Sequence, residues 1–233
     1  YAAGNQREHR GSHQGGAADS DRSARLSSPV GPGAPGNPND TKNRTIHEGS
    51  STTHLSVMDN AGNAVSLTQT VEAFFGSAVV LAGYGFIMNN EMLDFDPVPG
   101  GPNSVAPGKK PLSSMSPTIV LKDGRPILSV GSPGSKRIIT AVTQVLLNVL
   151  DHGMGIAEAI DAPRIHTDTG VLHIEGRFSP GVAAELEALG HNVNVHPEYD
   201  FYFGGAHGVL YDPGTGELRG GADPRREGAA IGV

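Results

Sequence analysis

The stretch Glu48-Gly49-Ser50-Ser51-Thr52-Thr53-His54-Leu55-Ser56-Val57-Met58-Asp59 separates two regions of different character. Before it lies a long tract with little to bury, and after it begins a dense series of strand and helix signals. Two small hydroxyl residues, Ser51 and Thr52, stand at the border. Such a border is typical of a precursor that cleaves itself, and cleavage of the Ser51–Thr52 bond would make Thr52 a new N-terminus.

A threonine at a new N-terminus carries a hydroxyl and an α-amine on the same residue. The amine can act as base for the hydroxyl, which gives a nucleophile without histidine. An α-amine has a pKa near ~8, so much of it is free base around neutral pH, whereas a lysine amine near ~10.4 is almost wholly charged. Taken alone, Thr52-Thr53 is better explained as the start of a β-strand after a leader, and only the downstream motifs change that balance.

Composition narrows the classes of function. The 233 residues are enough for one large domain, or for one domain and a tail. A net charge of -7, with no run rich in lysine or arginine, argues against a nucleic-acid partner. The absence of cysteine excludes disulfides, thiol catalysis and thiolate metal sites. No apolar run reaches the ~18 residues of a membrane span. The ten histidines show no metal-binding spacing, so neither a metal nor a cofactor is expected.

Residues 1–51 contain only three aliphatic side chains larger than alanine: Leu26, Val30 and Ile46. Too little apolar surface exists to offset the entropy of ordering this Gly/Pro/Ser-rich segment, so we expect a disordered linker. It is a plain spacer, a tether loose enough for the Ser51 carbonyl to reach the Thr52 hydroxyl, or both. The chain begins with Tyr1, so we expect its natural start, and any targeting segment, to lie upstream.

The region from 52 to 233 alternates strand and helix signals. Leu55 and Val57 share one face of a strand at 53–59, and a turn at 59–63 leads into an alternating strand at 64–71; this hairpin brings the Thr52 and Thr70 ends together. Further strands are predicted at 84–89, 117–121, 126–130, 171–175, 192–196, 206–211 and 217–221, and helices at 138–150, 156–160 and 180–189. The pattern predicts the α+β class, with mostly antiparallel sheets and helices on their outer faces.

The segment 131–137, Gly-Ser-Pro-Gly-Ser-Lys-Arg, joins a strand to the long helix. Backbone N–H groups at a helix N-terminus can cradle a phosphate or a developing oxyanion. A Walker A motif would need glycine at Lys136 and lysine at Arg137, which favours the oxyanion over the phosphate. A plain tight turn remains the alternative if this segment is taken by itself.

Two other segments carry polar chemistry. Ser113, Ser114 and Ser116 stand between two prolines at 111–117, where short hydroxyls suit a carboxylate or an amide, and an ordinary loop explains them equally well. Glu91 and Asp94 could hold a substrate ammonium, although a solvated acidic turn is the simpler explanation of that segment alone.

Five motifs together closely resemble the γ-glutamyltranspeptidase family. They are Thr52-Thr53-His54, Asn89-Asn90-Glu91-Met92 with Asp94-Phe95, Pro111-Leu112-Ser113-Ser114-Met115-Ser116-Pro117, Gly131-Ser132-Pro133-Gly134 and Ala222-Asp223-Pro224-Arg225. The resemblance covers essentially all of 52–233. It implies the N-terminal-nucleophile hydrolase fold, a four-layer αββα sandwich, of which this chain would be the small-subunit half: a linker at 1–51 that ends the large-subunit region, then a catalytic domain at 52–233.

The resemblance also implies roles for individual residues. Thr52 would cleave the precursor and then attack the γ-glutamyl amide of glutathione or a relative, and water or an amino acid or peptide amine would release the resulting ester. The other implied positions are Thr70 supporting the nucleophile, Gly134 and Ser135 at the oxyanion hole, Glu72, Glu91 and Asp94 at the glutamyl α-amino group, and Ser113 and Ser114 at the α-carboxylate. The implied protein is a zymogen that matures into a heterodimer, needs no cofactor, and is secreted or periplasmic.

The sequence departs from the family pattern in ways that bear on activity. Ser135 replaces a second glycine, which is acceptable unless that position needs φ > 0. The link from Phe95 to Pro111 is short, so the lid loop of some members looks absent, and we expect a more open acyl site. The large subunit, which supplies half of the sandwich and an arginine for the substrate carboxylate, is missing, so this chain alone resembles a fragment.

Two alternatives stay open. A sibling acylase of the same fold could take other amides, such as a β-lactam side chain, a glutaryl group or poly-γ-glutamate. An inactive binding or structural domain is possible because the partner half is absent.

Overall fold

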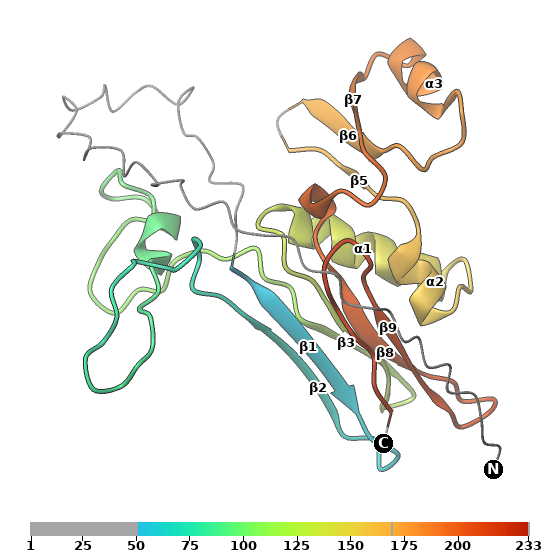
Figure 1. Cartoon of the computed structure of the whole chain (residues 1–233), viewed down its shortest axis with the longest axis horizontal. Helices are drawn as coiled ribbons and strands as arrows, with labels where there is room; N and C mark the ends of the chain where they lie inside the picture. The colour runs from blue at the N-terminus through green and yellow to red at the C-terminus, as the bar shows by residue number, and fades with distance from the viewer. Residues whose placement is uncertain (1–50, 169, 233) are drawn as a thin grey trace, which may run out of the picture. The chain divides into compact units, whose positions relative to one another are not determined.

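A computed structural model of the chain describes residues 51–168 and 170–232, which form three sheets (Figure 1). The linker predicted at 1–51 lies outside the described residues except for Ser51. The strands are β1 (Thr53–Met58), β2 (Ala64–Gln69), β3 (Thr118–Lys122), β4 (Arg125–Gly131), β5 (Ile165–His166), β6 (Val171–Glu175), β7 (Asn192–His196), β8 (His207–Tyr211) and β9 (Leu218–Ala222). The helices are α1 (Arg137–Leu150), α2 (Ile156–Asp161) and α3 (Val182–Ala188), with 3-10 turns η2 (Glu91–Asp94) and η3 (Phe201–Phe203).

The sheets are a β1–β2 hairpin, a four-stranded antiparallel sheet in the order β3-β4-β8-β9, and a three-stranded sheet in the order β5-β6-β7. Most predicted elements are confirmed to within two residues at each end. The expected antiparallel pairing has one exception, because β6 and β7 run parallel and α3 forms the crossover between them. A parallel pair requires such a crossover.

The strand predicted at 84–89 is wrong. Only an isolated bridge between Val80 and Ile87 forms there. Gly83 and Gly85 adopt φ of 83° and 74°, so the backbone turns where a strand would have to stay extended. Residues 84–89 therefore form a loop and not a strand.

Alternation along β4 gives the four-stranded sheet two different faces. Leu128 and Val130 are fully buried in one apolar cluster with Ile138, Val142 and Val145 of α1. Successive strand side chains point to opposite faces, so Ser129 and Gly131 face the hairpin instead. The Ser129 Oγ confirms this by donating to the Val65 carbonyl of β2 at 2.8 Å. Helices therefore cover one face of the sheet and the hairpin covers the other.

The hairpin packs on the sheet through polar side chains: Ser66 Oγ donates to the Val130 carbonyl at 3.1 Å. His54 Nδ1 lies 2.8 Å from Thr68 Oγ1, and its Nε2 lies 2.9 Å from Ser56 Oγ. Burial, with the neighbouring His207, lowers the pKa of His54 to about 4, so the ring is neutral at physiological pH. A Cβ on Gly131 would lie 2.3 Å from the His54 ring, so only glycine lets the strands approach this closely.

The described residues thus supply a four-stranded sheet with helices on one face and the β1–β2 hairpin on the other, and a separate three-stranded sheet. The mixed α/β architecture is established, and the full four-layer sandwich stays a prediction because it needs further elements. Among the described helices, none is both long and apolar enough to cross a membrane.

Candidate active site

Thr52 lies at the head of β1, where the hairpin presents it to a second threonine. The register pairs Thr53 with Gln69, which places Thr52 opposite Thr70. Thr52 is buried, and its Oγ1 donates to Thr70 Oγ1 at 3.1 Å. Thr70 Oγ1 also accepts the Glu72 backbone N–H at 2.8 Å, which fixes the acceptor in place. The convergence of the Thr52 and Thr70 ends, predicted from the hairpin, is confirmed.

The residue before Thr52 is also held. The Ser51 N–H donates to the Glu72 carbonyl at 3.0 Å, and Ser51 Oγ donates to the Ala73 carbonyl at 2.9 Å. Both partners follow β2 directly, so the Ser51–Thr52 bond is anchored on both sides by one short segment. Ordered placement of this bond is what an intramolecular attack by Thr52 requires.

The turn after β4 lies toward the same end of the hairpin. His54 packs on Gly131, and Ser56 Oγ contacts Ser129 Oγ at 3.1 Å. β1 and β4 therefore run in opposite directions where they face each other. Continuing this trend carries Thr52 toward Pro133 and Gly134. Within the described residues, the backbone N–H groups of Gly134 and Ser135 donate no hydrogen bond, which leaves them available to an oxyanion.

Ser135 adopts the left-handed conformation, with φ of 55°. Serine was expected to be acceptable here unless the position needs positive φ. The structure shows that it does need positive φ. Left-handed backbone is unfavourable for residues with a Cβ, by roughly 1–2 kcal/mol. Gly134 has φ of 139°, and a Cβ there would lie 3.1 Å from Gly204 Cα, so glycine is required at that position.

We predict that Ser135→Gly raises the free energy of unfolding by about 0.5 kcal/mol. Relief of left-handed strain outweighs the roughly 0.4–1 kcal/mol that glycine costs through a more flexible unfolded chain. Chemical denaturation of the two proteins measures the difference. The matched control is Ser179→Gly, at an exposed position without positive φ, which should lower the stability. An equal loss in both variants would contradict the prediction.

Three carboxylates gather beside this end of the hairpin. Glu72, Glu91 and Asp94 each offer an oxygen within 4.8 Å of the others, and among the described residues they are the one group of three His, Asp or Glu side chains with such spacing. Glu91 and Asp94 are the first and last residues of η2, and Glu72 belongs to the segment after β2, with φ of 71°. An acidic cluster of this kind attracts a cation, either an ammonium group or a metal ion.

Crowding changes how these carboxyls titrate. Burial and the charges of Asp94 and Glu72 raise the pKa of Glu91 to about 7, and burial and Asp94 also raise the pKa of Glu72. The folded state therefore holds protons that the unfolded state releases. It follows that the free energy of unfolding falls as pH rises from the ordinary glutamate pKa of 4.5 to about 7. A bound ammonium would reverse this penalty.

We predict that affinity for a substrate with a free α-ammonium rises with pH in the assembled protein. Between pH ~6 and ~8 the Glu91 carboxyl ionises. The added charge should lower KM at least about fivefold, because two unit charges ~4 Å apart attract each other by ~1 kcal/mol even at the dielectric constant of water. In Glu91→Gln the rise should vanish and KM should stay high. Glu217→Gln, which removes an exposed carboxylate of the β8–β9 turn, is the control and should keep the wild-type profile. A wild-type KM that does not change with pH would exclude this role for Glu91.

The serine loop at 111–117 contacts the oxyanion turn directly. Ser114 Oγ donates to the Ser135 carbonyl at 2.9 Å, whereas Ser113 Oγ accepts the Met115 N–H at 3.2 Å. The structure thus places Ser114 beside the predicted oxyanion residues. Ser113 is exposed next to it.

Sequence reasoning missed two asparagines that hold these segments together. Asn90 Oδ1 accepts the Ala73 N–H at 3.0 Å, and its own N–H donates to the Val71 carbonyl at 3.3 Å. Asn103 Nδ2 donates to the Asp94 carbonyl at 2.7 Å, and its Oδ1 accepts the Leu112 N–H at 3.0 Å. Asn90 therefore links the acidic cluster to the hairpin, and Asn103 links it to the serine loop.

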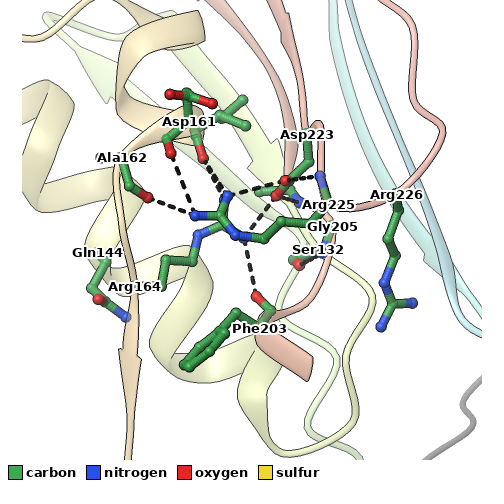
Figure 2. Close-up of polar contacts among 12 residues, drawn as sticks. Ser132, Gln144, Asp161, Ala162, Arg164, Phe203, Gly205, Asp223, Arg225 and Arg226 are labelled. Atoms are coloured by element: carbon green, nitrogen blue, oxygen red, sulfur yellow. Dashed lines mark hydrogen bonds and ion pairs between the residues drawn. The ribbon is translucent and has the colours of Figure 1, made fainter. Parts of the chain in front are cut away.

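A buried ion network behind the oxyanion turn was also missed (Figure 2). Arg164 Nη1 lies 2.7 Å from Asp223 Oδ2, and Arg225 binds Glu175 through two contacts of 2.5 Å. These four side chains are at most 2% exposed. Asp223 Oδ2 accepts the Ala206 N–H at 2.7 Å, and the neighbouring Gly205 N–H donates to Ser132 Oγ at 3.1 Å. The network therefore fixes the strand-entry segment against which the turn at Ser132–Ser135 rests.

Comparison with known proteins agrees with this arrangement. The sequence profile of the family described as Gamma-glutamyltranspeptidase matches residues 19–233. A glutathione hydrolase proenzyme of Bacillus subtilis (strain 168) is 42% identical over 183 residues, or 78% of this chain and 31% of the relative. An acylase ACY 1 proenzyme of Pseudomonas sp. (strain SE83) is 41% identical over 186 residues, which cover 80% of this chain and 33% of that protein.

Solved structures show the same likeness. A crystal structure of a Helicobacter pylori gamma-glutamyltranspeptidase variant matches with a TM-score of 0.68 and 42% identity, covering 75% of this chain and all of the matched chain. Fold and sequence place the protein among the N-terminal-nucleophile (Ntn) hydrolases. Within them, the chain belongs to the gamma-glutamyltranspeptidase family. It spans about a third of the length of the curated relatives it matches.

Proposed function

We propose that the complete protein transfers and hydrolyses γ-glutamyl groups. The observation that carries this proposal is the buried Thr52 hydroxyl, hydrogen-bonded at 3.1 Å to Thr70 at the head of the hairpin. After cleavage of the Ser51–Thr52 bond, the α-amine of Thr52 takes the proton from its own Oγ1. The Oγ1 then forms a bond to the γ-carbonyl carbon of the substrate.

The rest of the reaction would use the turn that follows β4. The N–H groups of Gly134 and Ser135 stabilise the negative charge on the carbonyl oxygen. The amine leaving group departs with the proton, which leaves a γ-glutamyl ester on Thr52. Water or the amine of an amino acid or peptide then attacks the ester and restores the free threonine.

The proposed substrate is glutathione or a related γ-glutamyl compound. Its α-ammonium group would be held by Glu72, Glu91 and Asp94, whose oxygens lie within 4.8 Å of one another. Its α-carboxylate would be held by the hydroxyls of Ser113 and Ser114, the second of which touches the oxyanion turn. Recognition at both α-substituents would select a γ-glutamyl group with a free amino acid end.

An acylase is the second candidate, because the similar Pseudomonas protein is named as one. The two functions differ in whether the acyl group carries an α-ammonium. The assembled protein should release the amine from a γ-glutamyl anilide, and from a glutaryl anilide at least about 100-fold more slowly, since unpaired buried polar groups reject an analogue strongly. Equal rates on both anilides would favour the acylase.

The proposal includes a second polypeptide segment, the large subunit of the same precursor. Leu55, Val57, Val65 and Leu67 all lie on the hairpin face that points away from the four-stranded sheet, and each is 46–53% exposed. A contiguous apolar strip on a sheet face is typical of a protein interface. The residues preceding this chain in the relatives' proenzymes are the proposed cover, and the chain alone is expected to be inactive.

We predict that Leu67→Asp prevents this chain from associating with its large subunit, because a charge would be buried in an apolar contact. Co-purification of the two segments after co-expression measures the association. Leu189→Asp is the matched control, since Leu189 is 77% exposed at the end of α3. Retained association in Leu67→Asp would show that this face is not the interface.

The short link at 96–111 supports a further part of the proposal. It holds one isolated bridge, Asp96 to Ser104, and the Lys109 ammonium donates to the carbonyls of Gly101 and Pro102. A link of this kind leaves little chain to form a lid. We therefore expect relatively more hydrolysis and tolerance of longer glutamyl chains; a low ratio of hydrolysis to transfer with dipeptide acceptors would contradict this.

A further inference from the structure

A cluster of ring and amide nitrogens lies on one face of the small β5–β7 sheet, apart from the residues assigned to γ-glutamyl chemistry. His173 of β6 pairs in register with Asn194 of β7, and His196 is two residues further along β7 on the same face. His173 Nδ1 and His196 Nε2 are 2.9 Å apart. Asn194 Nδ2 lies 3.3 Å from the first and 3.2 Å from the second. We call these three side chains the β6–β7 donor cluster.

The Asp200 carboxylate determines which ring nitrogen of His196 carries the proton. Its Nδ1 lies 2.8 Å from Asp200 Oδ2, and a carboxylate only accepts hydrogen bonds, so Nδ1 carries the proton. In the neutral form of the ring, Nε2 then presents a lone pair to the other two members. A carboxylate behind a histidine is the arrangement that orients metal-binding imidazoles in proteins.

Hydrogen bonds alone do not satisfy all three contacts in the cluster. If His173 Nδ1 donates to His196 Nε2, it meets the Asn194 amide as donor against donor. If both rings accept from Asn194, the two ring nitrogens face each other with lone pairs. Turning the amide, whose oxygen and nitrogen are interchangeable in shape, makes its oxygen face the His196 lone pair. One of the three contacts is unfavourable in every case.

A cation resolves this conflict, and the dimensions suit one. A triangle with these edges has its corners about 1.8 Å from its centre, so an ion about 1 Å out of the plane lies at the ~2.0–2.1 Å that zinc–nitrogen bonds require. The rotated Asn194 would offer its oxygen as the third ligand. The Tyr202 ring packs tilted against His173 and stacks on His196, at centroid distances of 4.8 and 4.6 Å, which holds both imidazoles in orientation.

We propose that His173, Asn194 and His196 form a binding site for a divalent transition-metal ion of the zinc type, with Asp200 orienting His196. Imidazole ligands select zinc, copper or nickel over magnesium or calcium. Asn194 is exposed, so the fourth coordination position is open to water. The ion would join β6, β7 and the segment before η3, and so stabilise the three-stranded sheet. Neither Thr52 nor the acidic cluster takes part, so the site is independent of the proposed catalysis.

The test is isothermal titration of Zn²⁺ into the complete, EDTA-treated protein. We expect one site per chain with a dissociation constant in the micromolar range or below. Binding at that site should be lost in His196→Gln and in His173→Gln, and it should weaken about 10–100-fold in Asp200→Asn, as the removal of an orienting carboxylate does. Mg²⁺ should give no binding at the same concentrations.

Controls separate this site from adventitious zinc. His191→Gln removes an exposed histidine just before β7 and should leave the titration unchanged. The histidines of the tail are present in every variant, so they contribute equally to all of the titrations. Zn²⁺ should also raise the melting temperature of the wild type but not of His196→Gln. Zinc binding of equal affinity in the wild type and in His196→Gln, or no binding in the wild type, would overturn the proposal.

Discussion

Replacing Thr52 with alanine is expected to abolish both cleavage of the Ser51–Thr52 bond and turnover of γ-glutamyl substrates. The variant lacks the oxygen that forms the ester, and removal of a nucleophile in related acyl chemistry lowers kcat by about 10⁴-fold or more. The hydroxyl of Thr70, at 3.1 Å from Thr52 Oγ1, cannot substitute because it carries no α-amine. Gel analysis of processing and release of amine from a γ-glutamyl anilide measure the two effects.

Thr53→Ala provides the matched control for Thr52→Ala. Thr53 is the adjacent threonine, and its hydroxyl takes no part in the proposed reaction, so Thr53→Ala should keep most of the processing and turnover that Thr52→Ala loses. Thr52→Ser keeps a hydroxyl on the same backbone and should retain measurable cleavage and turnover. If Thr52→Ala were still turning over substrate at more than a trace, the nucleophile would lie elsewhere.

The second large effect is expected at Arg225. Arg225→Met removes the guanidinium that contacts Glu175 at 2.5 Å and Asp223 at 3.1 Å, and leaves both buried carboxylates with one cation fewer. Removing one partner of a buried ion pair lowers the free energy of unfolding by about 3–5 kcal/mol. Arg225 also donates to the carbonyls of Ile160 and Ala162, so the end of α2 loses its anchor as well. Denaturant titration of the assembled protein should show the loss.

An exposed arginine gives the comparison for Arg225→Met. Arg219 contacts Glu217 at 2.9 Å, but both side chains are more than half exposed, and exposed ion pairs contribute about 0–1 kcal/mol. Arg219→Met should therefore change stability little. Should the two substitutions destabilise the protein equally, the buried network would have no special role in holding the segment behind the oxyanion turn.

The parts of the site that the sequence predicted are those set by local chain geometry. The turn at 59–63 determines the register of the hairpin, and the register alone brings Thr52 to Thr70. The helix N-terminus after Gly131 is likewise readable, because a strand signal passes directly into a helical period. Short-range rules suffice for such elements.

The parts that were missed depend on pairings between distant residues. Arg164 and Asp223 are far apart in the chain, and nothing in either local pattern indicates that they meet as a buried pair. The faces of the hairpin were ambiguous for a related reason. An alternating strand shows that its two faces differ, but not that the polar face, with His54 and Ser56, is the one that packs within this chain. The apolar face is exposed in this chain, and the large subunit is its proposed cover.

Ser135 illustrates a third limit. The sequence showed serine where glycine is common, but only the backbone angle of 55° shows that the position is left-handed. Similarly, His173 and His196 lie on different strands, and only the parallel β6–β7 pairing places their rings together.

Catalysis by Thr52 requires that it become a free N-terminus. The intact mass and N-terminal sequence of the small polypeptide from the assembled, active wild-type protein test this requirement. We expect a chain that begins at Thr52, with the Ser51–Thr52 bond fully cut. An uncut Ser51–Thr52 bond in protein that turns over γ-glutamyl substrate at the full rate would contradict it.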